Sequence, residues 1–122
     1  MKNAATVLCV SEDLYALHEI LRALQATEHR LLTACSYFRA ATLAAAEKID
    51  VIVMAYGIFG HAITCPANLK FLRPEIPILL VSLRGTRSDA VPIGADMIAG
   101  SVDEVSTSIE MLLDQGCTTH IV

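Results

Sequence analysis

The feature that most constrains this chain is a regular alternation between short apolar runs and segments with helical periodicity. Continuous apolar runs are typical of strands that are buried on both faces of a parallel sheet. Their alternation with amphipathic segments predicts that a crossover helix follows each strand. The expected strands are residues 6–10, 31–35, 50–55, 77–82 and 97–99.

The expected helices are recognised by apolar stripes and by start and stop signals. Leucines at helical spacing define a helix after the first strand. Ser36 is a candidate N-cap for a second helix, and a short third helix should end before Pro74. The pattern Ser101-x-x-Glu104 is a capping box and predicts the start of the last helix. The apolar residues expected to face the core are Leu14, Leu17, Leu21, Leu24, Phe38, Leu43, the alanines within residues 40–46, Val105, Ile109 and Leu112.

These strand and helix units predict one α/β domain. Because parallel crossovers are right-handed, few windings are available, and the flavodoxin-like strand order 2-1-3-4-5 is the natural choice. We therefore expect a doubly wound five-stranded parallel sheet between two helix layers. The functional crevice of this fold lies at the carboxyl ends of the first and third strands, after Val10 and around Ala55. The domain is expected to span residues 1–116, followed by a loose C-terminal tail over residues 117–122.

Composition argues against several classes of function. The net charge is −4 and no basic run is present, so nucleic-acid binding has no electrostatic support. Charged residues, prolines and glycines interrupt every apolar run before about 18 residues, so no membrane-spanning helix is expected. The cysteines follow no disulfide framework, and we expect buried, reduced thiols in a cytoplasmic protein. These cysteines are Cys9, Cys35, Cys65 and Cys117.

Four segments have an order and spacing found in one known family. They are the acidic corner Val10-Ser11-Glu12-Asp13, the third strand opening at Asp50, the fourth strand ending at Ser82, and Gly94-Ala95-Asp96 before the fifth strand. Through these segments the chain resembles the receiver domain of two-component response regulators over residues 5–114. In a typical receiver, two acidic residues after strand one and an aspartate ending strand three hold Mg²⁺, and that aspartate accepts a phosphoryl group. A hydroxyl ending strand four and a lysine ending strand five contact the phosphoryl oxygens.

The resemblance implies a phosphorylation pocket that has lost its essential groups. The acceptor position is Ala55, whose methyl group is neither a nucleophile nor a metal ligand. Ser11 stands at the first acidic position and Ser101 at the lysine position, and no lysine follows Lys70 in the chain. The degenerate pocket comprises Ser11, Glu12, Asp13, Ala55, Tyr56, Ser82 and Ser101, and Ile98 occupies the family's aromatic switch position.

We therefore expect a pseudo-receiver, a phosphorylation-independent signalling or adaptor domain that acts through protein–protein contacts in a phosphorelay pathway. The resemblance implies a partner such as a histidine kinase or another regulator, and it leaves a homodimer open. No catalytic residue, metal ligand or cofactor is expected. An enzyme is the least favoured class, because no glycine-rich phosphate loop follows the first strand and no nucleophile–base pair can be assigned.

The main alternative is a sensor that binds a small ligand or an anion in the vacated pocket, lined by Glu12, Ala55, Tyr56 and Ser82. Each polar residue of this pocket also has a structural interpretation. Glu12 and Asp13 either bind a cation or favour the start of a helix through its dipole. Ser82 either contacts a ligand or satisfies nearby backbone groups.

Two further features allow more than one interpretation. The apolar loop of residues 56–60 either docks a partner or a ligand, or folds back onto the core. The pairs His61–Cys65 and Cys117–His120 have spacings that metal ligands use, but a zinc site would need both pairs to meet. Their helices are expected on opposite faces of the sheet, which argues against zinc. His18 and His29 are interpreted as surface or helix-end residues.

Overall fold

The computed structural model describes the backbone of residues 4–56, 66–82 and 94–121, with the side chains of the last helix described as far as residue 114. Five parallel strands form one sheet in the order β2-β1-β3-β4-β5, which confirms the predicted topology. Their limits differ from the expected ones by one residue at most. The strands are β1 (Thr6–Val10), β2 (Arg30–Ala34), β3 (Val51–Tyr56), β4 (Ile78–Ser82) and β5 (Met97–Ala99).

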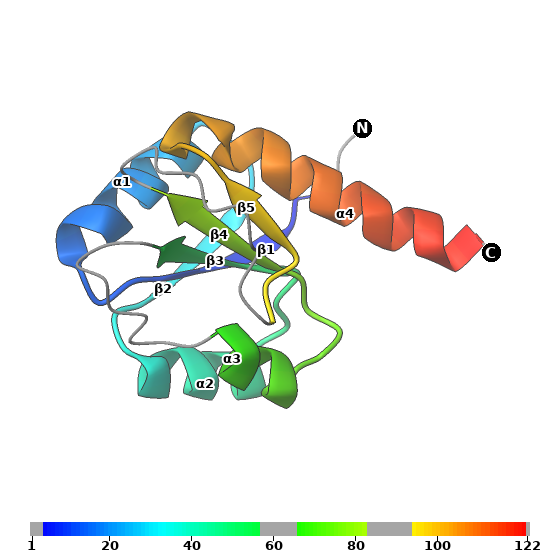
Figure 1. Ribbon diagram of the computed structural model, residues 1–122, viewed down its shortest axis with the longest axis horizontal. Coiled ribbons are helices and arrows are strands. Elements are labelled where there is room, and N and C mark those ends of the chain that lie inside the picture. Colours follow the sequence, from blue (N-terminus) through cyan, green and yellow to red (C-terminus); the bar gives the residue numbers. More distant parts are fainter. Residues whose placement is uncertain (1–3, 57–65, 83–93, 122) are drawn as a thin grey trace.

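The described helices form one layer on each face of the sheet (Figure 1). The helices α1 (Leu14–Leu24) and α4 (Val105–Ile121) cover one face, and a short 3₁₀ turn, η1 (Val102–Glu104), precedes α4. The helices α2 (Tyr37–Ala46) and α3 (Pro66–Leu72) cover the other face. The three-layer arrangement is therefore the one that the sequence predicts.

Both faces of the sheet are buried, as the continuous apolar runs require. Val7 and Cys9 of β1 point into the core beneath α1 and α4, and Leu8 and Val10 point into the core beneath α2 and α3. Each fully buried aliphatic side chain of this kind contributes roughly 1.5–3 kcal/mol to folding. Burial also raises the pKa of the Cys9 thiol to about 12, so Cys9 is a protonated core residue. The expectation of a buried thiol is wrong for Cys35, which is exposed.

Two residues predicted to face the core point into solvent instead. Leu14 is 68% exposed because it opens α1, one turn before the buried stripe formed by Leu17 and its neighbours. Phe38 is 80% exposed, since the buried residues of α2 are Ala40 and Ala44. Two positions from Ala40 is about 200° around a helix, so Phe38 lies on the opposite side. Small alanines, and not the phenylalanine, pack against the sheet.

The last helix continues further than the sequence suggests. Its backbone is helical to Ile121, past Gly116, so residues 117–121, expected as a loose tail, form the end of α4 (Figure 1). A helical glycine keeps its backbone hydrogen bonds and costs only about 1 kcal/mol relative to alanine, so Gly116 need not end the helix. The domain limit at residue 116 stays a prediction. The loop of residues 57–60 and the His61–Cys65 pair lie outside the described residues, as do the side chains of residues 117 and 120.

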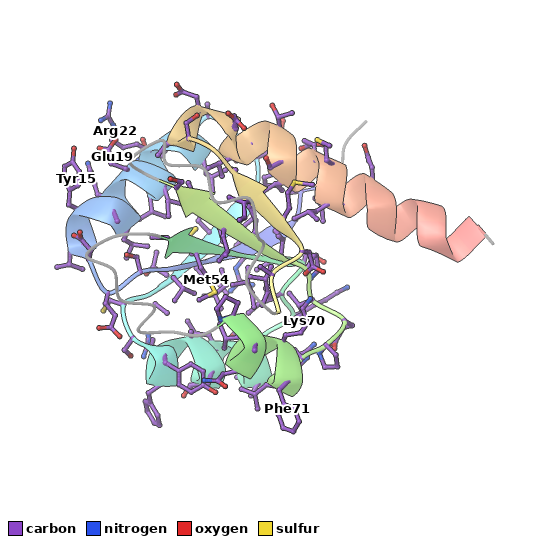
Figure 2. The ribbon with its side chains drawn as sticks, in the orientation of Figure 1. Tyr15, Glu19, Arg22, Met54, Lys70 and Phe71 are labelled. Carbon is purple, nitrogen blue, oxygen red and sulfur yellow. The ribbon has the colours of Figure 1, made fainter. Side chains whose placement is uncertain are left out.

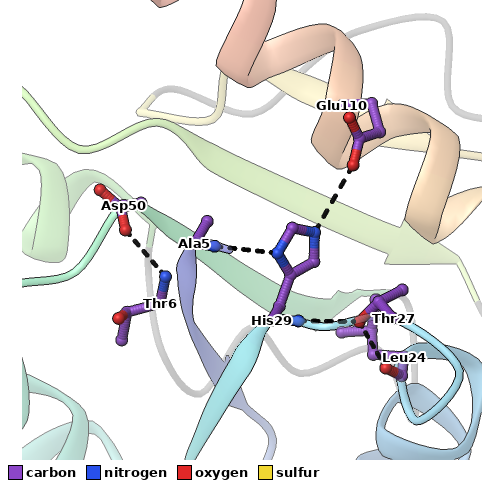
Figure 3. Close-up of polar contacts among 7 residues, drawn as sticks. All are labelled: Ala5, Thr6, Leu24, Thr27, His29, Asp50 and Glu110. Atoms are coloured by element: carbon purple, nitrogen blue, oxygen red, sulfur yellow. Dashed lines mark hydrogen bonds and ion pairs between the residues drawn. The ribbon is translucent and has the colours of Figure 1, made fainter. Parts of the chain in front are cut away.

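Side chains hold the strands together at the amino edge of the sheet. His29 precedes β2, and its Nδ1 accepts a hydrogen bond from the Ala5 N–H at 3.0 Å. Asp50 precedes β3, and its Oδ2 accepts from the Thr6 N–H at 2.8 Å (Figure 3). Asp96 precedes β5 in the same way, and its Oδ2 accepts from the Ile78 N–H at 2.8 Å.

These three contacts correct one prediction and explain part of the resemblance. His29 is not a surface residue, because its side chain is only 6% exposed and its Nε2 lies 3.6 Å from Glu110 Oε2 (Figure 3). Asp50 and Asp96, which belong to the family-like segments, act as strand connectors. The signal available in the sequence is the polar residue directly before β2, β3 and β5.

We expect Asp50→Ala to lower the free energy of unfolding by about 1–2 kcal/mol, because the Thr6 N–H loses its charged acceptor. Asp50→Asn keeps an acceptor oxygen and should lose less. Urea denaturation measures both changes, with Glu28→Ala as the control for loss of an exposed carboxylate. An effect of Asp50→Ala no larger than that of Glu28→Ala would show that the connector contributes nothing.

Gly94 is held in a conformation that other residues rarely adopt. Its φ is 96°, and a Cβ at this position would come within 2.5 Å of the Ala67 backbone at the start of α3. We expect Gly94→Ala to destabilise the protein by about 2 kcal/mol or more, since both the backbone strain and the overlap oppose it. Thermal unfolding followed by circular dichroism tests this, and an unchanged midpoint would contradict it.

Candidate functional site

The candidate site lies at the carboxyl edge of the sheet, where β1, β3 and β4 end. The strand register pairs Val10 with Met54, and Tyr56 with Ser82. Ser11 follows Val10, and Ala55 follows Met54. The register of β1 and β3 therefore brings Ser11 and Ala55 together. The structure thus gathers the ends of three strands that the sequence singled out.

Ala55 offers no polar side-chain atom to this edge. It is half-buried, and its methyl group packs against the core beneath α1 and α4, on the same side as Val53. It pairs with Val81 of β4. The backbone of Tyr56 continues the strand beside Ser82. The end of β3 therefore carries a methyl group where it could have carried an oxygen ligand or nucleophile.

Ser11 is buried, and its hydroxyl shapes the turn between β1 and α1. The Ser11 Oγ accepts from the Asp13 N–H at 3.1 Å and donates to the Asp13 carbonyl at 3.0 Å. The Ser11 N–H donates to the Ala34 carbonyl at 3.1 Å, which ties the turn to the end of β2. Local backbone groups thus use the Ser11 hydroxyl.

The two carboxylates of the acidic corner differ in role. Asp13 is the N-cap of α1, and its Oδ1 accepts from the Tyr15 N–H at 2.9 Å. This contact supports the structural interpretation of Asp13. Glu12 is exposed, and no hydrogen bond or ion pair of its side chain is found among the described residues.

These groups do not fit a magnesium site of the receiver type. Mg²⁺ requires near-octahedral oxygen coordination, usually with carboxylates that are not already engaged. At this edge Ala55 supplies no ligand, and Asp13 is engaged as a cap. Among the described residues, no group of three or more His, Cys, Asp or Glu side chains is placed to hold a metal ion.

The two remaining serines are placed differently. Ser82 is 2% exposed at the end of β4. Ser101 precedes η1, and the predicted capping box does not form: its side chain makes no capping hydrogen bond. Because η1 winds as a 3₁₀ turn, the Glu104 N–H donates to the Ser101 backbone carbonyl at 3.1 Å and does not need the hydroxyl. The Glu104 carboxylate instead accepts from the Gly100 N–H at 3.3 Å.

Neither described lysine reaches the carboxyl edge. The Lys70 ammonium binds Asp96 Oδ2 at 2.6 Å and the Ile76 carbonyl at 2.8 Å, close to the start of β4 (Figure 2). Lys48 lies between α2 and β3, at the amino edge. Within the described ranges, therefore, no ammonium group is available to contact a phosphoryl oxygen at this edge.

The order of the parallel strands and the helix layer on each face of the sheet define a flavodoxin-like α/β domain with the fold of response regulator receiver domains. The chain is similar to a response regulator receiver domain protein (CheY-like) from Methanospirillum hungatei JF-1, with a TM-score of 0.74, 15% identity and coverage of 96% of this chain and 99% of that chain. The chain is also similar to NtrX from Brucella abortus, with a TM-score of 0.77 and 18% identity, and the match covers 97% of this chain and 28% of that chain.

A third similar structure is a response regulator protein from Burkholderia pseudomallei with a phosphorylated aspartic acid, calcium ion and citrate. Its TM-score is 0.68 at 19% identity, and the match covers 95% of this chain and 72% of that chain. No protein-family model matches the chain, and no curated protein matches it in sequence. No described helix combines the length and the apolar character that crossing a membrane requires.

We expect Asp13→Ala to lower the free energy of unfolding by about 1 kcal/mol, because α1 loses its N-cap. Glu12→Ala, the matched control on the neighbouring exposed residue, should change it by less than about 0.5 kcal/mol. Neither value should change when Mg²⁺ is added to the denaturation experiment. Stabilisation of the unmodified chain by Mg²⁺ that Glu12→Ala removes would instead establish a cation site.

Proposed function

We propose that this chain is a phosphorylation-independent signalling or adaptor domain that works through protein–protein contacts in a two-component type pathway. The observation that carries the proposal is Ala55 at the end of β3, in a five-stranded sheet that has the strand order of receiver domains. Phosphoryl transfer to a receiver needs an acceptor oxygen together with groups that neutralise the transferred charge. A methyl group supplies neither.

The neighbouring groups support the same proposal. Ser11 and Asp13 are engaged in the β1–α1 turn and the α1 cap, so they stabilise the local structure. Lys70 is bound at the opposite edge of the sheet. The described residues place no cation at this edge, where the carboxylate of Glu12 would oppose the negative charge of an incoming phosphoryl group. The described part of the edge is suited to contact with a partner and poorly suited to phosphotransfer.

An enzymatic function has less support. The thiol of Cys9 is protonated and buried in the core, so it cannot serve as a nucleophile. Within the described residues, the buried hydroxyl of Ser11 is hydrogen-bonded to backbone groups and not to a general base. The proposed partners are a histidine kinase or another regulator, which places the protein's action in the cytoplasm.

Incubation with acetyl phosphate and Mg²⁺, followed by intact mass spectrometry, tests this proposal. We expect no phosphoryl adduct on the chain, because the acceptor oxygen is missing. A receiver that keeps its aspartate serves as the positive control under the same conditions. A stoichiometric adduct on an aspartate of this chain would sink the proposal.

A further inference from the structure

The outer surface of the α2 and α3 layer is unusually poor in charge. Arg39 is the only charged residue of α2, and Lys70 is the only charged residue of α3. Lys70 is bound to Asp96 and does not serve this surface. A helix on a protein surface normally carries charged and polar residues on the side opposite the core. We name as the α2–α3 face the exposed apolar and small residues Phe38, Thr42, Ala45, Ala46, Phe71 and Leu72; the polar residues Arg39 and Asn68 of these helices are exposed as well.

Aromatic side chains dominate this face. Phe38 is 80% exposed, Phe71 is 86% exposed and Leu72 beside it is 46% exposed. Figure 2 shows the Phe71 side chain pointing away from the sheet. The other helix layer also exposes a large side chain, Tyr15, which is 71% exposed. Charged residues of α1, such as Glu19, lie close to it, whereas alanines lie between the two phenylalanines.

The α2–α3 face is one continuous surface. The two helices pack against each other, and the Arg73 guanidinium after α3 donates a hydrogen bond to the Ala44 carbonyl of α2. Both helices run antiparallel to the strands. Phe38 at the start of α2 therefore lies towards the carboxyl edge, and Phe71 at the end of α3 lies towards the amino edge (Figure 1).

This placement is self-complementary. A two-fold axis through the centre of the face would set Phe38 of one copy against Phe71 of the second copy, and the reverse contact would follow by symmetry. Aromatic pairs of this kind add about 0.5–1.5 kcal/mol beyond the area that they bury. The small side chains of Thr42 and Ala45 near the centre allow the two helix layers to approach closely.

The charges at the ends of the face match the same arrangement. Arg39 lies beside Phe38, and no ion pair of its side chain is found among the described residues. Glu75 follows the end of α3, with a side chain that is 60% exposed and contacts Arg73 at 2.7 Å. The two-fold arrangement brings Arg39 of each copy close to Glu75 of the other, so opposite charges meet twice.

The area is sufficient for a weak interface. Since an aromatic side chain buries 150–250 Å², the two phenylalanines offer roughly 300 Å² per copy. Leu72 and the exposed residues of α2 add to this. A standard interface buries about 800 Å² per partner, so a dimer that depends on protein concentration is the expected outcome.

From these observations we propose that the α2–α3 face is a two-fold interface between two copies of this chain. The proposal does not depend on the signalling function proposed above. Sedimentation velocity of the full chain over a range of concentrations should show a reversible monomer–dimer equilibrium. The expected dissociation constant is on the order of 10–100 μM, because the interface is smaller than the standard size.

Exposed-site variants test whether this face is responsible. Phe38→Ser and Phe71→Ser should each weaken dimerisation by about tenfold or more, since aromatic residues are the common energetic centres of interfaces. Tyr15→Ser, which removes an exposed aromatic side chain from the other helix layer, should leave the equilibrium unchanged. Circular dichroism confirms that each variant is folded.

A charge exchange tests the two-fold arrangement itself. Arg39→Glu and Glu75→Arg should each weaken dimerisation, because like charges would then meet across the axis. The double variant Arg39→Glu/Glu75→Arg should restore it. A chain that stays monomeric at several hundred micromolar, which is about three or more times the largest expected dissociation constant, overturns the proposal and leaves the face to another protein or to none. Equal weakening by Tyr15→Ser, or no restoration by the double variant, overturns it as well.

Discussion

The rest of this structure depends on the hydrogen bonds that side chains accept from backbone N–H groups at the amino edge of the sheet. In a sheet buried on both faces, N–H groups at the strand ends are costly if they remain unpaired. His29, Asp50 and Asp96 accept from those groups. Because these acceptors join β1 to β2, β1 to β3 and β4 to β5 where the strands begin, they help to set the register that brings residues together at the opposite edge.

The two edges of the sheet thus have different tasks. The amino edge uses its charged side chains for stability, and Lys70 is bound there by Asp96. At the carboxyl edge, Ser11 and Asp13 satisfy local backbone groups, and Ala55 adds only a methyl group to the core. At the described part of this edge, Ser11 and Asp13 are therefore committed to local structure, whereas no hydrogen bond or ion pair of the exposed Glu12 side chain is found among the described residues.

The two helix layers differ in the kind of surface that they offer. The α1–α4 layer carries charged residues such as Glu19 and Arg22, which form an ion pair at 3.4 Å. The α2–α3 layer packs small alanines inward and leaves Phe38 and Phe71 outward. Because Ala40 and Ala44 allow close packing on the sheet, the larger aromatic side chains are free for contacts between molecules.

The sequence by itself determined the sheet, its strand order and the absence of an acceptor oxygen at Ala55, because apolar runs and residue identity are local properties. Only the tertiary structure decided that Phe38 points into solvent, that the Ser11 hydroxyl is hydrogen-bonded to the Asp13 backbone and that His29 accepts from the Ala5 N–H. The capping pattern at Ser101 is misleading, because in the 3₁₀ turn the Glu104 N–H donates to the Ser101 backbone carbonyl and not to the side chain. Each of these depends on partners distant in sequence or on backbone winding, which a residue pattern does not specify.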